Sequence, residues 1–278
     1  MSISDTPPDS HIRKAVTIND LRSRRSSLDR ITMLTCYDAS FASLMNDCGV
    51  DILLVGDSLG MVLQGHESTL PVTVEDIAYH TRCVARRKGK SWLMADMPFG
   101  SYQESPAQAY HNAATLMAAG AQMVKLEGGA WLASTVRFLT ERGIPVCAHL
   151  GLTPQSVHSL GGYRVQGRDH KAAEQLLADA RTLESAGADI ILVELIPSSL
   201  GKRLTETLTV PTIGIGAGPH MTGQVLVLHD ILDVTPGKRA RFAKNFLEES
   251  GSIRGALERF VREVKSGAYP APEHSFSE

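Results

Sequence analysis

The stretch Asp51-Ile52-Leu53-Leu54-Val55-Gly56-Asp57 is an apolar run that ends in a carboxylate. The same pattern recurs three more times along the chain, in Ser91–Asp96, Met123–Glu127 and Asp189–Glu194. Runs rich in Ile, Leu and Val are typical of parallel strands that are buried on both faces. Because the carboxyl ends of such strands meet at one rim, the sequence predicts four acidic side chains on the same edge of a parallel sheet.

Strand-like and helix-like segments alternate through the rest of the chain. We expect eight strands, at Ile31–Tyr37, Asp51–Gly56, Ser91–Met97, Met123–Glu127, Pro145–Leu150, Asp189–Leu195, Pro211–Gly216 and Val225–His229. We expect helices at Val16–Ser26, Asp38–Asp47, Val74–Lys88, Pro106–Ala119, Ala130–Arg142, Lys171–Ala186 and Ser252–Lys265. An open doubly wound sheet usually has about five or six strands, so this count favours a closed barrel. The predicted fold class is α/β, a (β/α)8 TIM barrel with an N-terminal leading helix.

Length and composition fit one globular domain. The chain has 278 residues, of which 43% are hydrophobic and 21% charged, and its net charge is −2. We expect a single barrel domain over residues 1–278, with flexible termini at about 1–15 and 268–278. Nothing in the charge balance indicates nucleic acid or a membrane as a partner, and no apolar run approaches the ~20 residues of a membrane span. We therefore expect a cytoplasmic protein.

Two smaller features are expected to be structural. The four cysteines form no CxxC pair, which favours free thiols in a reducing compartment. Arg22, Arg24 and Arg25 form a short basic cluster in the leading helix. Charge runs usually face water, so we expect this cluster to be a solvated helix face.

The repeated carboxylates suggest a metal site. Neighbouring strands lie about 5 Å apart, so Asp57, Asp96 and Glu127 on successive strands can converge on one cation. Oxygen ligands of this kind suit Mg²⁺, and Glu194 then remains as a general base that removes a proton next to a carbonyl. One such acid alone would more often be a helix cap. The repetition at equivalent strand ends favours the metal site.

Three further residues lie close to these acids in the sequence. Lys125 precedes Glu127 by two positions, so both side chains should face the barrel interior. A buried lysine needs an anionic partner, which here is a substrate carboxylate, a metal-bound acid or a purely structural aspartate. Ser58 follows Asp57 at a helix-like turn, where its hydroxyl and N–H suit a substrate carboxylate. His149 ends the fifth strand and is expected to support the residues that touch the ligand.

The chain resembles the ketopantoate hydroxymethyltransferase (3-methyl-2-oxobutanoate hydroxymethyltransferase) family from about Thr17 to Phe246. The resemblance is carried by the segments Thr35–Asp38, Val55–Gly60, Ala95–Tyr102, Val124–Gly129, His149–Gln155, His158–Tyr163, Val165–Arg168 and Val193–Pro197. It implies a TIM-barrel enzyme of pantothenate biosynthesis, the route to coenzyme A. Such an enzyme transfers a hydroxymethyl group from 5,10-methylenetetrahydrofolate to 3-methyl-2-oxobutanoate through a Mg-stabilised enolate, giving 2-dehydropantoate.

The resemblance also implies roles for individual residues. Asp57 and Asp96 would hold Mg²⁺, with Glu127 in its coordination sphere. The 2-oxo acid would chelate the metal, and its binding residues would be Asp57, Ser58, Asp96 and Lys125. Glu194 would be the catalytic base. Family members assemble as homodecamers, so a homo-oligomer is expected here.

Two departures and two alternatives accompany the resemblance. Met221-Thr222 stands where the family usually has Cys-Asp, and Leu232-Asp233-Val234 stands where it usually has Leu-Gly followed by a hydrophobic residue. One alternative is another Mg-dependent C–C lyase or aldolase barrel for 2-oxo acids, although the Lys-Lys-Cys-Gly-His signature of such lyases is absent from the chain. The other is an inactive barrel that serves as a binding module, which the intact acids argue against.

Overall fold

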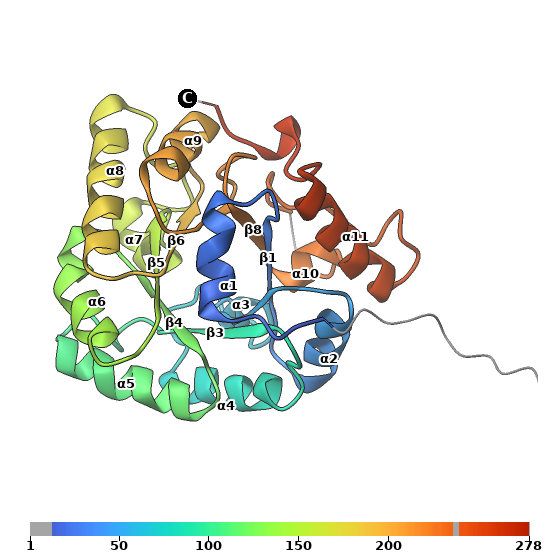
Figure 1. Ribbon diagram of the computed structural model, residues 1–278, viewed down its shortest axis with the longest axis horizontal. Coiled ribbons are helices and arrows are strands. Elements are labelled where there is room, and N and C mark those ends of the chain that lie inside the picture. The colour runs from blue at the N-terminus through green and yellow to red at the C-terminus, as the bar shows by residue number, and fades with distance from the viewer. Residues whose placement is uncertain (1–12, 236–238, 278) are drawn as a thin grey trace, which may run out of the picture.

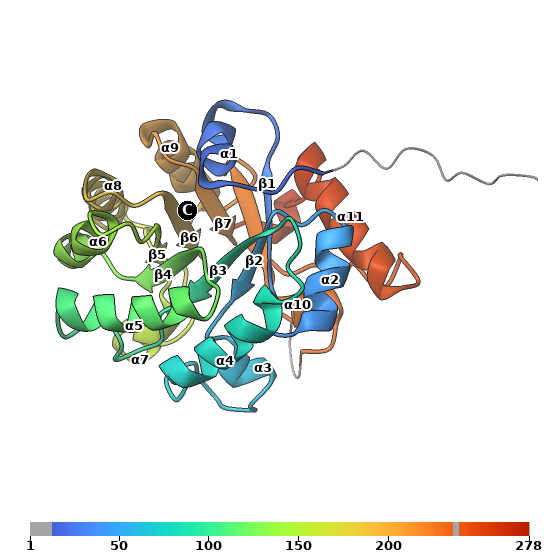
Figure 2. The same cartoon turned by 60° about the horizontal axis from the view of Figure 1, so that its bottom comes forward.

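A closed barrel of eight parallel strands forms the centre of the molecule (Figures 1 and 2). The computed structural model describes residues 13–235 and 239–277, so the predictions for residues 1–12 lie outside it. The strands follow one another around the barrel in sequence order: β1 Ile31–Thr35, β2 Ile52–Val55, β3 Trp92–Asp96, β4 Met123–Glu127, β5 Val146–Gly151, β6 Ile190–Glu194, β7 Thr212–Ile215 and β8 Gly223–Leu226. Pairing of β1 with β8 closes the ring. The predicted TIM-barrel fold is confirmed.

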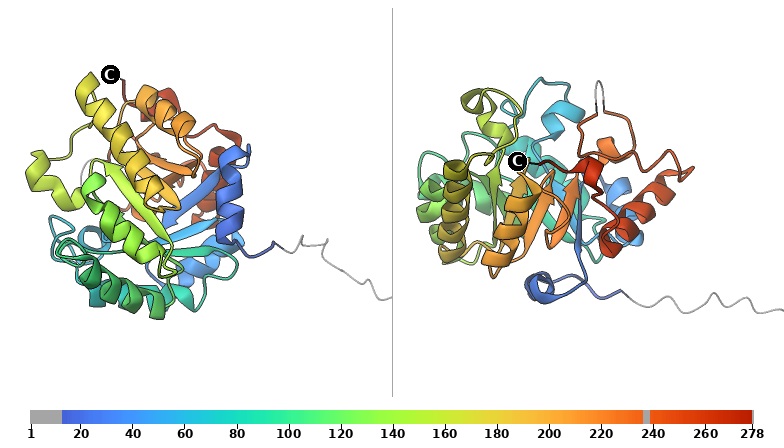
Figure 3. Two further views of the ribbon diagram at one scale, coloured as in Figure 1. Left: turned by 60° about the vertical axis from the view of Figure 1, so that its left-hand side comes forward. Right: turned by 90° about the horizontal axis from the view of Figure 1, so that it is seen from above.

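Helices lie around the barrel, most of them on its outer face (Figures 1 and 3). They are α1 Ile18–Ser23, α2 Ala39–Asp47, α3 Leu59–Val62, α4 Val74–Ala85, α5 Pro106–Ala118, α6 Ala133–Thr140, α7 Val157–Leu160, α8 His170–Ser185, α9 Ser198–Thr207, α10 Leu228–Ile231 and α11 Ile253–Ser266. Short 3-10 turns lie at η1 Arg24–Ser26, η2 Ala130–Leu132, η3 Pro154–Ser156 and η4 Pro272–His274. Side chains that accept backbone N–H groups begin many of the longer helices, which fixes where each starts. These caps are Asp38, Thr73, Ser105, Asp169 and Ser252.

The eighth strand and four helices, α3, α7, α9 and α10, differ from the sequence-based expectation. β8 begins at Gly223, two residues before the expected Val225–His229, because Gly223 pairs with Ile31 of β1. A Cβ on Gly223 would lie 2.6 Å from the Ile31 carbonyl oxygen, so only glycine allows this approach. The chain then turns into α10 instead of continuing as a strand. Helices α3, α7 and α9 were not expected from the sequence.

The basic cluster of the leading helix is not a solvated face, and that prediction was wrong. Figure 3 shows the leading helix beneath the barrel, at the end where the strands begin. Arg22 Nε donates to Asp189 Oδ1 over 3.0 Å, and Arg25 Nε donates to the Leu208 carbonyl oxygen over 2.8 Å. The guanidinium groups therefore tie this helix to the lower rim.

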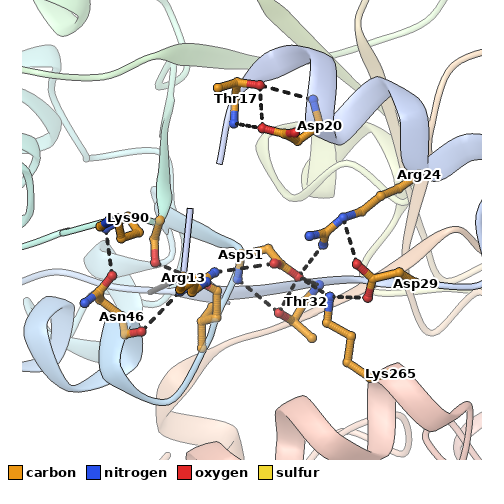
Figure 4. A network of polar contacts seen from close by, with 12 residues as sticks. Arg13, Thr17, Asp20, Arg24, Asp29, Thr32, Asn46, Asp51, Lys90 and Lys265 are labelled. Atoms are coloured by element: carbon orange, nitrogen blue, oxygen red, sulfur yellow. Dashed lines mark hydrogen bonds and ion pairs between the residues drawn. The ribbon is translucent and has the colours of Figure 1, made fainter. Parts of the chain in front are cut away.

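Asp51 is the centre of the polar network at this lower rim (Figure 4). Its side chain is only 4% exposed, and its Oδ2 lies 2.7 Å from Arg24 Nη1 and 2.8 Å from Lys265 Nζ. The backbone N–H and hydroxyl of Thr32 donate to the same oxygen, each over 2.9 Å, and Arg13 Nη2 lies 3.4 Å from Oδ1. Burial alone would raise the pKa of Asp51, but the charges of Lys265 and Arg24 outweigh it and lower the pKa. The network joins α11 and η1 to the start of β2.

The C-terminal segment, which we expected to be flexible from residue 268, packs against the barrel at two points. Tyr269 is buried beside Phe246 and Phe260, and its hydroxyl donates to the Phe242 carbonyl oxygen over 2.6 Å. The Ser198 N–H at the start of α9 donates to the Phe276 carbonyl oxygen over 2.9 Å. All four cysteines are free, as predicted. Within the described ranges, none of the helices combines the length and apolarity that crossing a membrane requires.

Candidate active site

Charged side chains gather at the carboxyl ends of five consecutive strands, as the sequence predicted. Asp57 follows β2 closely, and Asp96 is the last residue of β3. Strand β4 contributes Lys125 and Glu127, β5 contributes His149, and β6 ends in Glu194. The strand register pairs Asp96 with Lys125 and Glu127 with His149, which places these groups at one height. All of them are buried except Glu194, whose side chain is 13% exposed.

Five of these groups form a row of alternating charge, which we call the charged row: Asp96, Lys125, Glu127, His149 and Glu194. Lys125 Nζ lies 3.0 Å from Asp96 Oδ1 and 3.2 Å from Glu127 Oε1. His149 Nδ1 lies 3.2 Å from Glu127 Oε1, and its Nε2 lies 3.4 Å from Glu194 Oε2. Burial would lower the pKa of His149, but the charge of Glu127 outweighs it and raises the pKa to about 9. His149 is therefore cationic at neutral pH.

Asp57 lies beside the Asp96 end of the charged row. Its backbone N–H donates to Asp96 Oδ2 over 2.9 Å. Burial, together with the negative charges of Asp96 and Glu127, raises the pKa of Asp57 well above its usual value. With all four acids ionised, the site would hold four negative charges against two cationic side chains. A bound divalent cation would balance this difference and favour the ionised form of Asp57.

The donor atoms fit a hard cation at Asp57 and Asp96. Asp96 Oδ1 is buried and accepts no well-aligned hydrogen bond, although Lys125 is close. In the described part of the chain, no three His, Cys, Asp or Glu side chains are already grouped as ligands around one point. Two carboxylates are enough for Mg²⁺, which usually keeps several waters and takes further oxygens from its substrate. Both oxygens of Glu127 are engaged, Oε1 by Lys125 and His149 and Oε2 by the Gln155 N–H.

Sequence reasoning missed two neutral residues that support these acids. The Gln155 side-chain amide donates to Asp57 Oδ2 and to the Met97 carbonyl oxygen, in both cases over 2.9 Å. The Tyr102 hydroxyl donates to Gln155 Oε1 over 2.6 Å. Both side chains are buried. Both residues lie inside the motifs that carry the family resemblance, which is the only signal in the sequence that could have pointed to them.

Ser58 lies beside Asp57 at the same rim, and its role in binding a substrate stays a prediction. It directly precedes α3, and its Oγ lies 2.9 Å from the hydroxyl oxygen of Tyr37, a buried residue that the sequence did not single out. A Cβ on Gly56 would lie 3.0 Å from Ser58 Oγ and 3.4 Å from Asp96 Oδ2. Glycine at this position therefore leaves room for the Ser58 hydroxyl to share the space beside Asp96.

Two long loops meet over the carboxylates. Tyr163, in the loop that follows β5, contacts Met61 of α3 through a 3.7 Å hydroxyl-to-sulfur contact. Burial raises the pKa of Tyr163, and the charges of Glu194, Asp57 and Glu127 raise it further. Gly161 and Gly162 just before it have φ values of +70° and +106°, which glycine adopts without strain. The loops form a partial cover for the site.

The two departures from the family pattern lie outside this cluster. The Thr222 hydroxyl accepts the Thr212 N–H over 3.2 Å, at the start of β7. Asp233 has a φ of +58°, a left-handed conformation that aspartate tolerates better than most residues and that explains why glycine suits the position. The ion pairs that join the charged row involve neither residue.

Comparisons with known proteins identify the family of the chain. A model of the ketopantoate hydroxymethyltransferase family matches residues 15–272. The chain is 61% identical over 263 residues to 3-methyl-2-oxobutanoate hydroxymethyltransferase of Janthinobacterium sp. (strain Marseille), covering 95% of this chain and 96% of the relative. It is 60% identical to the protein of the same name from Azoarcus sp. (strain BH72), covering 95% and 97%.

The solved structures that resemble the fold are more distant. A structure of phosphonopyruvate hydrolase in complex with oxalate and Mg²⁺ superposes with a TM-score of 0.60 at 16% identity, covering 93% of each chain. An oxaloacetate acetylhydrolase structure superposes with a TM-score of 0.58 at 15% identity, covering 91% of this chain and 98% of the other. At these identities the likeness shows the barrel fold alone. The family match and the near full-length relatives show that the chain belongs to the ketopantoate hydroxymethyltransferase family.

Proposed function

We propose that the protein transfers a hydroxymethyl group from 5,10-methylenetetrahydrofolate to 3-methyl-2-oxobutanoate, giving 2-dehydropantoate for pantothenate biosynthesis. The observation that carries this proposal is the arrangement of the charged row. A pair of carboxylates suited to a cation, Asp57 and Asp96, lies at one end, and a partly exposed carboxylate, Glu194, lies at the other. A 2-oxo acid held at the first end would direct its carbon chain toward the second.

The chain's own residues divide the work of binding. Asp57 and Asp96 would hold Mg²⁺, and Glu127 would contribute through Lys125 and through water, because both of its oxygens are already engaged. Bound Mg²⁺ supplies a Lewis acid that polarises the keto oxygen of the 2-oxo acid. The substrate carboxylate would lie near the Ser58 hydroxyl and the Lys125 ammonium, which offset its charge.

Glu194 would remove the C3 proton of the 2-oxo acid, because it is the acid of the site with the most exposed side chain. His149 Nε2 lies 3.4 Å from Glu194 Oε2, and its charge would hold the Glu194 carboxylate on this side of the site. Water would release the methylene carbon of the folate as formaldehyde, breaking both of its C–N bonds and leaving tetrahydrofolate. The carbon nucleophile would then attack the formaldehyde carbon to form the new C–C bond, and the formaldehyde oxygen would take up a proton to become the hydroxyl of the product. The loops that meet at Tyr163 and Met61 would limit the access of water while the nucleophile exists.

Three further properties follow from family membership and are part of the proposal. The enzyme would be a homo-oligomer, a decamer as its family resemblance implies, and would act in the cytoplasm. Its partners would be small molecules, with no nucleic acid or membrane involved. Sedimentation of the purified protein tests the assembly, since a decamer of 30.0 kDa chains would sediment at about ten times the monomer mass.

Deuterium exchange tests the reaction at its first step. Proton NMR of 3-methyl-2-oxobutanoate in D₂O should show loss of the C3 proton signal with protein and Mg²⁺, and EDTA should stop it. Glu194→Gln should slow this exchange by roughly 10²–10⁴-fold, the usual contribution of a general base, while calorimetry shows unchanged substrate binding. Glu206→Gln, on the exposed face of α9, is the matched control and should exchange at the wild-type rate.

The possible outcomes separate the proposed function from its alternatives. No exchange by the wild-type protein, even with tetrahydrofolate added, would count against the substrate assignment. Exchange at the native rate by Glu194→Gln would remove Glu194 as the base but leave the substrate assignment intact. Cleavage of the 2-oxo acid instead of transfer would favour a C–C lyase.

A further inference from the structure

Gln155 lies at a junction between four strand ends. It belongs to η3, just after β5, and it is 4% exposed. Its backbone N–H donates to Glu127 Oε2 over 3.0 Å. Its side-chain nitrogen donates to Asp57 Oδ2 and to the Met97 carbonyl oxygen, each over 2.9 Å. One residue on the β5 loop thus contacts groups at the ends of β2, β3 and β4.

The orientation of the Gln155 amide is fixed by its partners. A carboxylate and a carbonyl can only accept hydrogen bonds, so the nitrogen must face Asp57 and Met97. The amide oxygen then faces Tyr102, whose hydroxyl donates to it over 2.6 Å. The Glu127 N–H in turn donates to the Tyr102 hydroxyl oxygen over 3.1 Å. The amide cannot turn over without leaving buried polar groups unpaired, which is costly.

These contacts determine which oxygen of Asp57 would face a ligand. Gln155 engages Oδ2 of Asp57, so Oδ1 would be the ligand oxygen, and it also holds Oε2 of Glu127, whose Oε1 is bound by Lys125 and His149. Asp57 is also repelled by the nearby charges of Asp96 and Glu127. The charge of Lys125 opposes this repulsion, and the Gln155 amide adds a hydrogen bond that fixes the direction of the Asp57 carboxylate.

We infer that Gln155 is a positioning residue that orients Asp57 and Glu127 for divalent-cation binding, with Tyr102 fixing its amide. This inference rests on the proposed function, because it assumes that Asp57 holds a divalent cation. Partners that hydrogen-bond to metal ligands typically contribute 10–100-fold in metal affinity. Loss of the Gln155 amide should therefore raise the dissociation constant for the cation by about 10–100-fold.

Manganese titration tests this inference without an activity assay. EDTA-treated full-length protein is titrated with Mn²⁺, and free Mn²⁺ is measured by electron paramagnetic resonance. Gln155→Met keeps the length of the side chain but removes its donors and its acceptor. Gln175→Met is the matched control, because the Gln175 amide donates to Asp179 Oδ1 over 2.8 Å on the exposed surface of α8. Thermal unfolding checks that each variant is folded.

We expect a 10–100-fold weaker Mn²⁺ affinity for Gln155→Met and an unchanged affinity for Gln175→Met. We also expect the KM for the 2-oxo acid to rise more than kcat falls once Mg²⁺ is saturating, because Gln155 touches neither Glu194 nor the substrate carbon. A folded Gln155→Met with an unchanged Mn²⁺ affinity would overturn the inference alone. A wild-type protein without a saturable Mn²⁺ site would overturn it together with the cation part of the proposed function.

If Gln155→Met does not fold, Tyr102→Phe tests the same inference. It keeps Gln155 but removes the hydroxyl that fixes the amide oxygen. A weaker Mn²⁺ affinity in this variant supports the inference, and an unchanged affinity overturns it.

Discussion

Replacing Asp51 by asparagine should destabilise the barrel from its lower rim. The change preserves shape and retains an oxygen for the Thr32 N–H, but it removes the negative charge shared by Arg13, Arg24 and Lys265. Removing one partner of a buried ion pair usually costs about 3–5 kcal/mol. The three cationic side chains are 16–29% exposed and can turn toward water, so we expect the lower end, about 3 kcal/mol.

Thermal unfolding followed by circular dichroism, at one protein concentration, measures this change. For a chain of this size 1 kcal/mol corresponds to roughly 2 °C, so the melting temperature should fall by about 6 °C at pH 7. Asp47→Asn is the matched control. Asp47 is half exposed and lies 3.7 Å from Arg254, and surface pairs of this kind contribute about 0–1 kcal/mol.

The dependence on pH gives a second, independent check. The pKa of Asp51 is lower in the folded protein than in the unfolded chain, where it is about 4. The contribution of Asp51 to the free energy of unfolding is therefore fully present above pH 4 and disappears as the pH falls through the pKa of the folded protein. The stability difference between wild type and Asp51→Asn should therefore be constant from pH 7 to 5 and shrink below pH 4. An equal melting temperature at pH 7, or a difference that grows in acid, would refute the reasoning.

Three further predictions concern the upper rim, where the strands end and the acids lie, and the buried thiols. Asp96→Ala should abolish the Mg²⁺ dependence of 2-oxo acid binding in calorimetry, and unchanged affinity would contradict the chelate. Lys125→Met removes the ammonium between Asp96 and Glu127, so the melting temperature in EDTA should fall. Adding Mg²⁺ should then raise the melting temperature of the variant by more than it raises that of the wild type. An equal rise in both proteins would argue against a shared cation site. Burial raises the pKa of Cys36 and of Cys147 to about 12, so neither should react with a thiol reagent at pH 8 in the folded protein; rapid labelling of either, mapped by mass spectrometry, would contradict that burial.

The acids of the site were predictable because each follows an apolar strand. Burial on both faces makes such strands continuous apolar runs, and a charged residue at the end of the run can only lie at a rim. The repetition on successive strands then predicted that Asp57, Asp96 and Glu127 lie close together, and the structure places them so. Their role as ligands stays a prediction.

The supporting residues were not predictable by the same reasoning. Gln155 and Tyr102 are neutral and lie in loops, where neither periodicity nor charge singles them out. Their importance comes from which strand ends the loop after β5 reaches, and that is decided by tertiary packing. Charge patterning also failed for Arg22 and Arg25, because the acceptors that bind them lie more than 160 residues away along the chain.

The missed elements have physical reasons of the same kind. Helix α9 contains Gly201, which lowers its helix propensity, but a Cβ there would lie 2.3 Å from the Ala217 carbonyl oxygen. Close packing against the loop after β7 thus requires the glycine that weakens the local signal. The start of β8 is set by pairing with Ile31, whose position almost 200 residues earlier no local window contains.

The two rims of the barrel carry opposite imbalances of charge, so the molecule has an electric polarity along the barrel axis. At the lower rim Arg13, Arg22, Arg24 and Lys265 outnumber Asp29, Asp51 and Asp189. At the upper rim four carboxylates outnumber Lys125 and His149. The field between the rims draws a cation to the upper mouth and repels an anion from it. For the proposed cation site, this imbalance would favour binding of the cation before that of the anionic 2-oxo acid.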